Sequence, residues 1–239
     1  MFLLNKKRIL FIISCIVCSI FSCSIIQLNQ KQTELVSSTP LTNHTIILDA
    51  GHGNPDGGAT NLNGEIIESE LNLSIVLKLQ NLLETSNCRV ILTRSDENGI
   101  YEADAKSIRQ KKISDMKNRV NIANTSNAEA FVSIHMNKLS QTQYSGWQCF
   151  YKDKDENSKV LANSIQNNLN IFIDTNNTRK IKSISGIHLT KHIKIPLVIV
   201  ECGFLSNLEE ANLLSSPSYQ DKLAWSIYTG LMDYFDKKN

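Results

Sequence analysis

The chain has 239 residues, of which 41% are hydrophobic and 20% are charged, a composition typical of a globular protein with one substantial core. Lysine and arginine together number 25 against 23 aspartate and glutamate residues, so the formal net charge is only +2. Because this charge is small and no basic stripe is interleaved with aromatic residues, the sequence excludes nucleic acid as a favoured partner.

The first 27 residues have the pattern of a secretion signal or membrane anchor. Three basic residues at positions 6–8 precede an apolar and small-residue run from Ile9 to Ile26, close to the ~18 residues that indicate a spanning helix. No small-x-small cleavage site follows the run, and neither Cys15 nor Cys23 has a convincing lipobox. An uncleaved anchor therefore fits the pattern as well as a signal does.

Residues 28–43 are polar, contain Pro40 and show no periodicity, so we predict a linker. The folded domain then occupies residues 44–239 and lies outside the cytoplasm, secreted or anchored at the cell envelope. Its three cysteines, Cys88, Cys149 and Cys202, are an odd number without the spacing of a disulfide framework or a cysteine metal site.

Within the domain, apolar runs alternate with stretches of helical periodicity. We predict strands at 46–48, 88–93, 130–135, 146–151, 187–190 and 197–202, and helices around 71–82, 108–123, 160–169 and 223–234. Possible capping boxes that begin at Ser206 and Ser218 predict the starts of a short helix and of the last helix. Apolar strands separated by amphipathic helices indicate an α/β fold in three layers, with a mostly parallel central sheet flanked by helices on both faces.

The helix predicted over residues 108–123 carries both apolar and charged side chains. Its apolar positions, which include Ile108 and Ile113, are expected to face the core. Its charged residues are expected to form a solvated face; they are Arg109, Lys112, Asp115 and Arg119.

Three of the predicted strands end in residues that can bind a metal ion. His52 lies between two glycines after the first strand, His135 ends the third strand, and Glu201 ends the last. Ligands of open α/β sheets bind at the carboxyl ends of the strands. Glu68, at the start of the helix that follows the His52 loop, returns to this edge, so we expect His52, Glu68 and His135 to converge beside Glu201.

Two histidines and one glutamate, with a position left open for water, form a ligand set of catalytic zinc. Such a zinc ion lowers the pKa of its water to about 7 and polarises a carbonyl group. A further carboxylate that does not bind the metal can take the proton and pass it to a leaving nitrogen. The chemistry expected from this set is the hydrolysis of an amide.

Each of these residues also has a structural interpretation. Glu68 could be a first-turn acid favoured by the helix dipole, with Glu65 and Glu70 as rival ligands, and His135 could be a hydrogen-bonded core histidine. Glu201 is harder to explain in this way, because an unpaired acid behind an apolar strand costs several kcal/mol.

Three further residues have less defined roles. His188 and His192 are spare histidines, and His192, next to Lys191, suits the surface. Asp49 is expected either to orient a ligand or to brace the loop that carries His52.

Four segments resemble the four motifs of the zinc-dependent N-acetylmuramoyl-L-alanine amidases. They are residues 49–53 (DAGHG), 68–72 (ESELN), 133–137 (SIHMN) and 200–207 (VECGFLSN). The resemblance implies that His52, Glu68 and His135 bind zinc, with Glu68 preferred over its rivals, and that Glu201 is the catalytic acid/base. The implied substrate is peptidoglycan, cut between the lactyl group of muramic acid and the L-alanine of the stem peptide.

The sequence departs from the family pattern at two positions, where Ala50 replaces a proline and Ser69 replaces a lysine. The N-terminal anchor on a single bare domain and the segments 146–151 and 226–230 are similar to germination-specific amidases, which act on the spore cortex before muramic-lactam formation. The absence of wall-binding repeats suggests targeting by the anchor or by a partner protein. The alternatives are a vegetative autolysin, a zinc peptidase acting within the stem peptide, and a non-catalytic wall-binding module.

Overall fold

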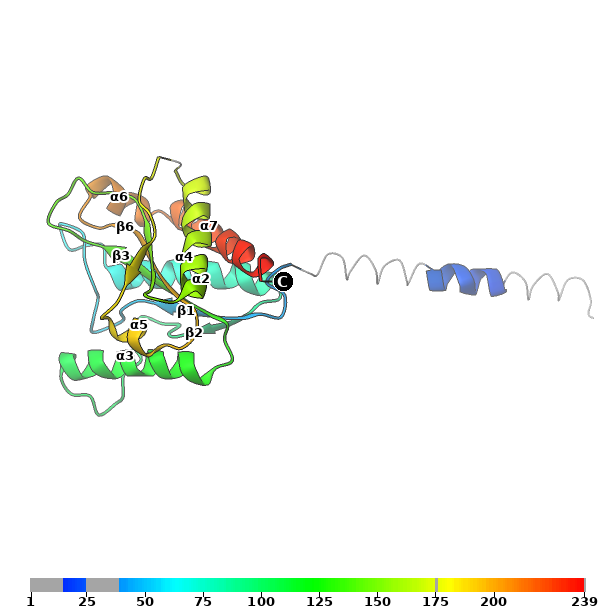
Figure 1. Cartoon of the computed structure of the whole chain (residues 1–239), viewed down its shortest axis with the longest axis horizontal. Coiled ribbons are helices and arrows are strands. Elements are labelled where there is room, and N and C mark those ends of the chain that lie inside the picture. Colours follow the sequence, from blue (N-terminus) through cyan, green and yellow to red (C-terminus); the bar gives the residue numbers. More distant parts are fainter. Residues whose placement is uncertain (1–14, 25–38, 175, 239) are drawn as a thin grey trace, which may run out of the picture. The chain divides into compact units, whose positions relative to one another are not determined.

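The computed structural model is built around one six-stranded sheet with the strand order β2-β1-β3-β6-β4-β5 (Figure 1). The strands are β1 (Thr45–Ala50), β2 (Arg89–Leu92), β3 (Ala130–Asn137), β4 (Gln148–Lys152), β5 (Lys182–Ile184) and β6 (Leu197–Phe204). β2, β1, β3 and β6 run parallel, whereas β4 is antiparallel to β6 and parallel to β5. The mostly parallel sheet predicted from the apolar runs is therefore confirmed.

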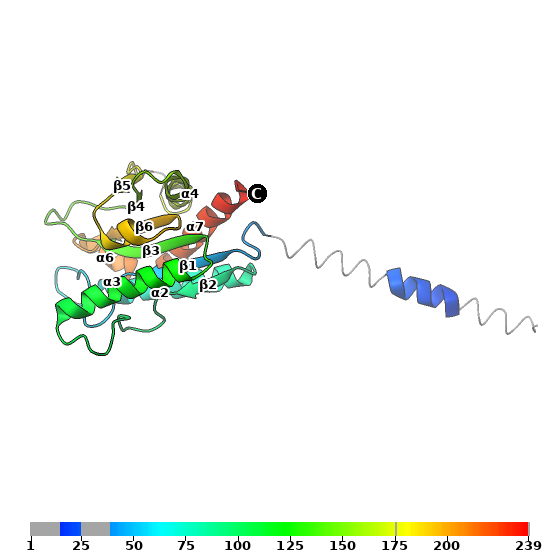
Figure 2. The same cartoon turned by 60° about the horizontal axis from the view of Figure 1, so that its bottom comes forward.

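Helices cover both faces of this sheet, as predicted. They are α2 (Glu68–Thr85), α3 (Ile108–Thr125), α4 (Glu156–Phe172), α5 (His188–His192), α6 (Leu208–Leu214) and α7 (Pro217–Asp236). Figure 2 shows the strands in order from β5 to β2 with α3 in front of them.

Alternation along each strand divides the core between the two faces. Ile46 and Leu48 of β1 pack in a cluster with residues of α2, α4, α6 and α7, whereas Ile47 packs in a second cluster with residues of α3 and α5. Successive side chains of a strand point to opposite faces, so strands that read as continuous apolar runs are buried on both sides. This gives the three layers of the predicted fold.

The structure describes residues 15–24, 39–174 and 176–238. Most of the predicted anchor (1–27) and of the predicted linker (28–43) lies outside these residues; residues 15–24 are helical. No helix in the described part of the chain combines the length and the apolar character needed to cross a membrane. Pro40–Asn239 form a compact unit of their own.

The strand predicted at residues 187–190 is wrong. The chain instead forms β5 five residues earlier, turns at Gly186 with φ 94°, and enters the short helix α5. Leu189 and Ile193, four residues apart, are the positions that reach the core, and this spacing belongs to a helix rather than a strand.

The two predicted capping boxes are also wrong in position. α6 is capped by Asn207, whose side chain accepts a hydrogen bond from the Glu210 backbone N–H, and α7 begins at Pro217 after Ser216. Asparagine caps helices as well as serine does, and proline is favoured at the first helical position because its missing N–H would have no partner there.

The predicted faces of α3 need correction as well. Arg119 is fully buried and Asp115 is 8% exposed, whereas Ile108 and Ile113 are exposed. The prediction for Arg109 and Lys112, which are exposed, is confirmed. Arg119 and Asp115 are buried as an ion pair, in which Arg119 also pairs with Asp49 of β1 and Asp115 also accepts a hydrogen bond from the Ile100 N–H.

Candidate active site

His52, Glu68 and His135 meet at the carboxyl edge of the sheet. One ligand atom from each lies within 4.8 Å of the others. Glu68 Oε1 lies 3.3 Å from His52 Nε2 and 3.0 Å from His135 Nδ1. The three residues come from the loop after β1, the start of α2 and the end of β3, which is the convergence expected from the sequence.

Glu68 is held by the backbone as well as by the two histidines. Its Oε2 accepts a hydrogen bond from the Ala59 N–H at 2.7 Å, and its Oε1 accepts one from the Met136 N–H at 3.1 Å. Burial opposes its ionisation, but hydrogen bonds from His135 and His52 hold the pKa of Glu68 well below its usual range. The side chain is therefore an ionised carboxylate, the form that binds a metal.

The rival acids lie outside this group. Glu65 is exposed and accepts a hydrogen bond from Asn63 Nδ2, and Glu70 is exposed on α2. Glu68 reaches the histidines because it is the first residue of α2, and this end of the helix lies at the carboxyl edge of the sheet.

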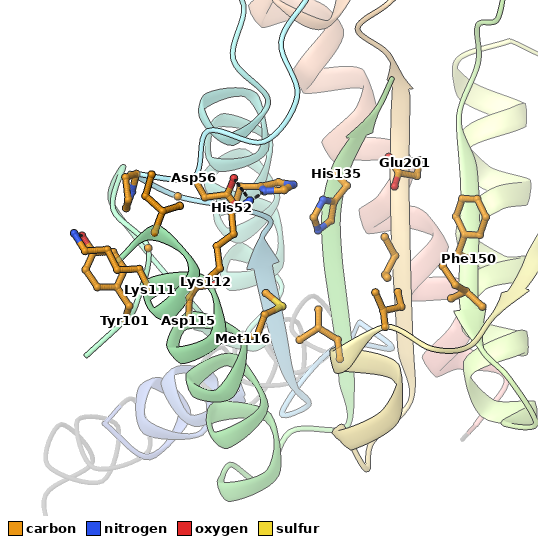
Figure 3. Close-up of a pocket in the computed structure, with 18 residues that line it drawn as sticks. His52, Asp56, Tyr101, Lys111, Lys112, Asp115, Met116, His135, Phe150 and Glu201 are labelled. Carbon is orange, nitrogen blue, oxygen red and sulfur yellow. Dashed lines mark hydrogen bonds and ion pairs between the residues drawn. The ribbon is translucent and has the colours of Figure 1, made fainter. Parts of the chain in front are cut away.

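His52 is oriented by Asp56, which the sequence reasoning missed. The two side chains hydrogen-bond at 3.1 Å between His52 Nδ1 and Asp56 Oδ2 (Figure 3). This bond leaves His52 Nε2 directed at Glu68. Burial lowers the pKa of His52, but the neighbouring Glu68 and Asp56 outweigh it and raise the pKa above its usual value. An acid four residues after a loop histidine is a sequence signal that could have found this pair.

Two glycines leave the space that these side chains occupy. A Cβ on Gly51 would lie 2.2 Å from Cε1 of His135, and a Cβ on Gly58, at φ 72°, would lie 2.6 Å from Oε2 of Glu68. Gly51 is therefore needed for the close approach of His135, and His52 itself adopts the left-handed region, at φ 62°.

Glu201 lies beside the group without joining it. It is paired in register with His135 on the neighbouring strand β6, so both side chains point to the same face of the sheet. Its Oε2 is buried and has no hydrogen-bond partner among the described residues. Burial raises the pKa of Glu201 above that of an ordinary glutamate. A carboxylate in this state can accept and return a proton.

The loop that carries His52 is fixed by a buried ionic network under it. Arg119 of α3 donates to Asp49 and to both carboxylate oxygens of Asp115, and it also donates to the carbonyls of Ala50 (2.9 Å) and His52 (2.6 Å). Asp49 also accepts from Thr93 and Ser133, so it braces the loop, which is one of its two predicted roles.

A second buried arginine holds the same loop from the other side. Arg94, which follows β2, donates to the carbonyls of Ala50, Gly51 and Ser69 at 2.8–3.1 Å. Asn72 adds a hydrogen bond to the Gly51 carbonyl at 3.1 Å. The position of His52 thus depends on side chains from three separate segments.

The remaining histidines take no part in the site. His188 and His192 lie on α5 with their ring centroids 4.4 Å apart and are not members of the group of possible metal ligands. Cys88, Cys149 and Cys202 are buried and free.

The family model of the N-acetylmuramoyl-L-alanine amidases, Amidase_3, matches residues 46–233 of the chain. The chain belongs to this amidase family. A relative, the germination-specific N-acetylmuramoyl-L-alanine amidase of Bacillus subtilis, is 39% identical over 201 residues, 84% of each chain. The N-acetylmuramoyl-L-alanine amidase LytC of the same organism is 31% identical over 198 residues, which are 82% of this chain and 36% of LytC.

A solved structure is also similar to the amidase. It is the CwlD amidase from Clostridioides difficile in complex with the GerS lipoprotein, which is 45% identical, with a TM-score of 0.80, over 82% of this chain and 100% of that one. The resemblance seen in the four motifs is confirmed, and the protein is an N-acetylmuramoyl-L-alanine amidase.

The side chains of the amidase also fit a metal ion. Two imidazoles and an ionised carboxylate converge, and the histidines remain 26% and 20% exposed, which leaves a side open to substrate and water. This donor set and its opening match the requirements of a catalytic metal site.

Proposed function

We propose that the amidase acts on the peptidoglycan of the spore cortex, where it cleaves between the lactyl group of muramic acid and the L-alanine of the stem peptide. The observation that carries the chemistry is the group of His52, Glu68 and His135 with Glu201 in register beside it, whose Oε2 has no hydrogen-bond partner among the described residues. The cortex is supported by the similarity over 84% of each chain to an amidase named as germination-specific.

We further propose that His52, Glu68 and His135 hold zinc. When bound, zinc supplies a Lewis acid for the scissile carbonyl and lowers the pKa of a water molecule. Asp56 keeps His52 in the orientation that presents Nε2 to the site. Glu201, whose Oε2 has no hydrogen-bond partner in the part of the chain that the structure describes, takes the proton of the attacking water and delivers it to the nitrogen of L-alanine.

Zinc is expected to stabilise the amidase. At about a hundredfold excess over its Kd, it should add about 2.7 kcal/mol to the free energy of unfolding, which raises Tm by about 5–10 °C in a domain of this size. The measurement is thermal unfolding of chelator-treated protein with and without added zinc, together with the zinc content of the purified chain.

The matched variants are His135→Ala, which removes a proposed ligand, and His192→Ala, which removes an exposed histidine on α5. Zinc should no longer raise Tm in the first and should raise it fully in the second. The same rise in both variants would contradict the ligand assignment.

The products of digestion test the proposed function. On purified cortex and on vegetative peptidoglycan, the amidase is expected to release intact stem peptides with an L-alanine N-terminus, and to do so faster on cortex. A peptidase acting within the stem would leave residues on the sugar, and a binding module would release nothing. Equal rates on both substrates would instead support a vegetative autolysin.

We propose that residues 1–27 are a signal or anchor, 28–43 a linker and 44–239 the catalytic domain, which places the activity outside the cytoplasm. The similar Clostridioides difficile amidase was solved in complex with a lipoprotein, which supports an envelope partner for this chain. Membrane fractionation of the full chain, and affinity purification from envelope extracts, test these two proposals. A soluble chain without specific partners, fully active alone, would count against both.

A further inference from the structure

A cavity of about 450 Å³ extends from the proposed zinc site across the α3/α5 face of the sheet. His52, His135 and Glu201 lie along one side of it, with Lys111 and Tyr101 at one end and Phe150 at the other (Figure 3). Its volume is within the range of about 300–1,000 Å³ found for sites that bind small ligands.

The floor of this cavity is apolar, because the helices leave part of the sheet uncovered. Phe150 and Ile199 point to the α3/α5 face of the sheet, in the same cluster as Leu189 of α5. Ile108 at the start of α3 lines the cavity although it is 60% exposed. This explains why an apolar residue of α3 does not face the core.

Most charged residues of the cavity are paired, and the exceptions are Glu201 and Lys111. Asp56 pairs with Lys112 at 3.0 Å and with His52, and Asp115 pairs with Arg119. Lys111 has no carboxylate within ion-pair distance among the described residues. Its Nζ lies 4.6 Å from the centre of the Tyr101 ring and 3.5 Å from the Tyr101 hydroxyl oxygen.

We propose that Lys111 binds a carboxylate of an acidic stem peptide whose scissile amide lies at the zinc site. This inference rests on the proposed function and names the peptide class that the site selects. Tyr101 holds the ammonium group at the end of the cavity by a cation–π contact, so the lysine is oriented before the ligand arrives. The apolar floor takes the aliphatic parts of the peptide, and the carboxylate takes the place of the missing acidic partner.

The test compares two substrates that differ only in this charge. One is N-acetylmuramoyl-L-alanyl-D-glutamate with its γ-carboxyl blocked as a methylamide and its α-carboxylate free, and the other is the same compound with the α-carboxylate as an amide. Lys111→Met should lower kcat/KM about tenfold on the acidic substrate, through KM, and leave the value for the amide unchanged. Lys111→Arg, which keeps the charge, should retain most of the activity. Lys117→Met, an exposed position on the same helix outside the cavity, should behave as wild type on both substrates.

Binding of the two product dipeptides, L-alanyl-D-glutamate γ-methylamide with its α-carboxylate free and the same dipeptide with the α-carboxylate as an amide, gives a readout that needs no turnover. The acid should bind wild type about tenfold more tightly than the amide, and Lys111→Met should bind both equally. The role of Lys111 would be overturned if Lys111→Met lost affinity equally for the acid and the amide, or lost affinity for neither. Selective binding of the acid without cleavage of either substrate would refute the proposed function and leave the role of Lys111 supported.

Discussion

Replacing Glu201 by glutamine is expected to lower kcat by about 10²- to 10⁴-fold, the usual contribution of a positioned general acid–base group. Glutamine has the same shape as glutamate but cannot take up the proton of the attacking water. Glu201 is in register with His135, and its Oε2 has no hydrogen-bond partner among the described residues. Steady-state hydrolysis of a muramoyl-peptide measures the effect.

The fold and the proposed zinc site should survive this substitution. A buried carboxylate is more costly than a buried amide, so Glu201→Gln should unfold at the same temperature as wild type or higher. Its zinc content should also be unchanged. Glu209→Gln, the same change at an exposed position on α6, serves as the control. Full activity in Glu201→Gln would refute the proposed role.

Replacing Arg119 by leucine is expected to destabilise the domain by about 3–5 kcal/mol, the usual cost of removing one partner of a buried ion pair. Asp49 is completely buried and would lose its charged partner, and the carbonyls of Ala50 and His52 would each lose a donor. Urea unfolding measures the loss. Arg109→Leu, an exposed position on the same helix, should change the free energy of unfolding by less than about 0.5 kcal/mol.

The loss of stability caused by Arg119→Leu should depend on pH. Although burial opposes its ionisation, Arg119 holds the pKa of Asp49 below its usual value. A lowered pKa stabilises the fold fully above the pKa of the unfolded chain, about 3.9, and this contribution disappears as the pH falls through the lower folded value. The difference in the free energy of unfolding between Arg119→Leu and wild type should therefore be largest at neutral pH and shrink below about pH 4. A difference that is constant with pH would show that the ionic network is not its cause.

The sequence determined the fold class and was enough to propose four site residues. Continuous apolar strands separated by amphipathic stretches predicted the three-layer architecture. A strand buried on both faces is apolar at every position, whereas a helix that covers a sheet is apolar only at the positions that recur every three to four residues. His52, His135 and Glu201 could be placed together because the carboxyl ends of parallel strands meet at one edge of a sheet. The choice of Glu68 over its neighbours came from its motif, since the start of α2 could not be located from periodicity.

Only the tertiary structure decided which charges are buried and where the cavity lies. Arg119 sits 70 residues from Asp49 in the chain, and nothing in the local pattern of α3 distinguishes it from the exposed Arg109. The burial of a charge depends on partners from other segments, and so does the exposure of Ile108, which borders the cavity because no element covers it. The proposed role of Lys111 rests on the same kind of fact. Its charge is visible in the sequence, but that no carboxylate of the described residues pairs with it is a property of the folded chain.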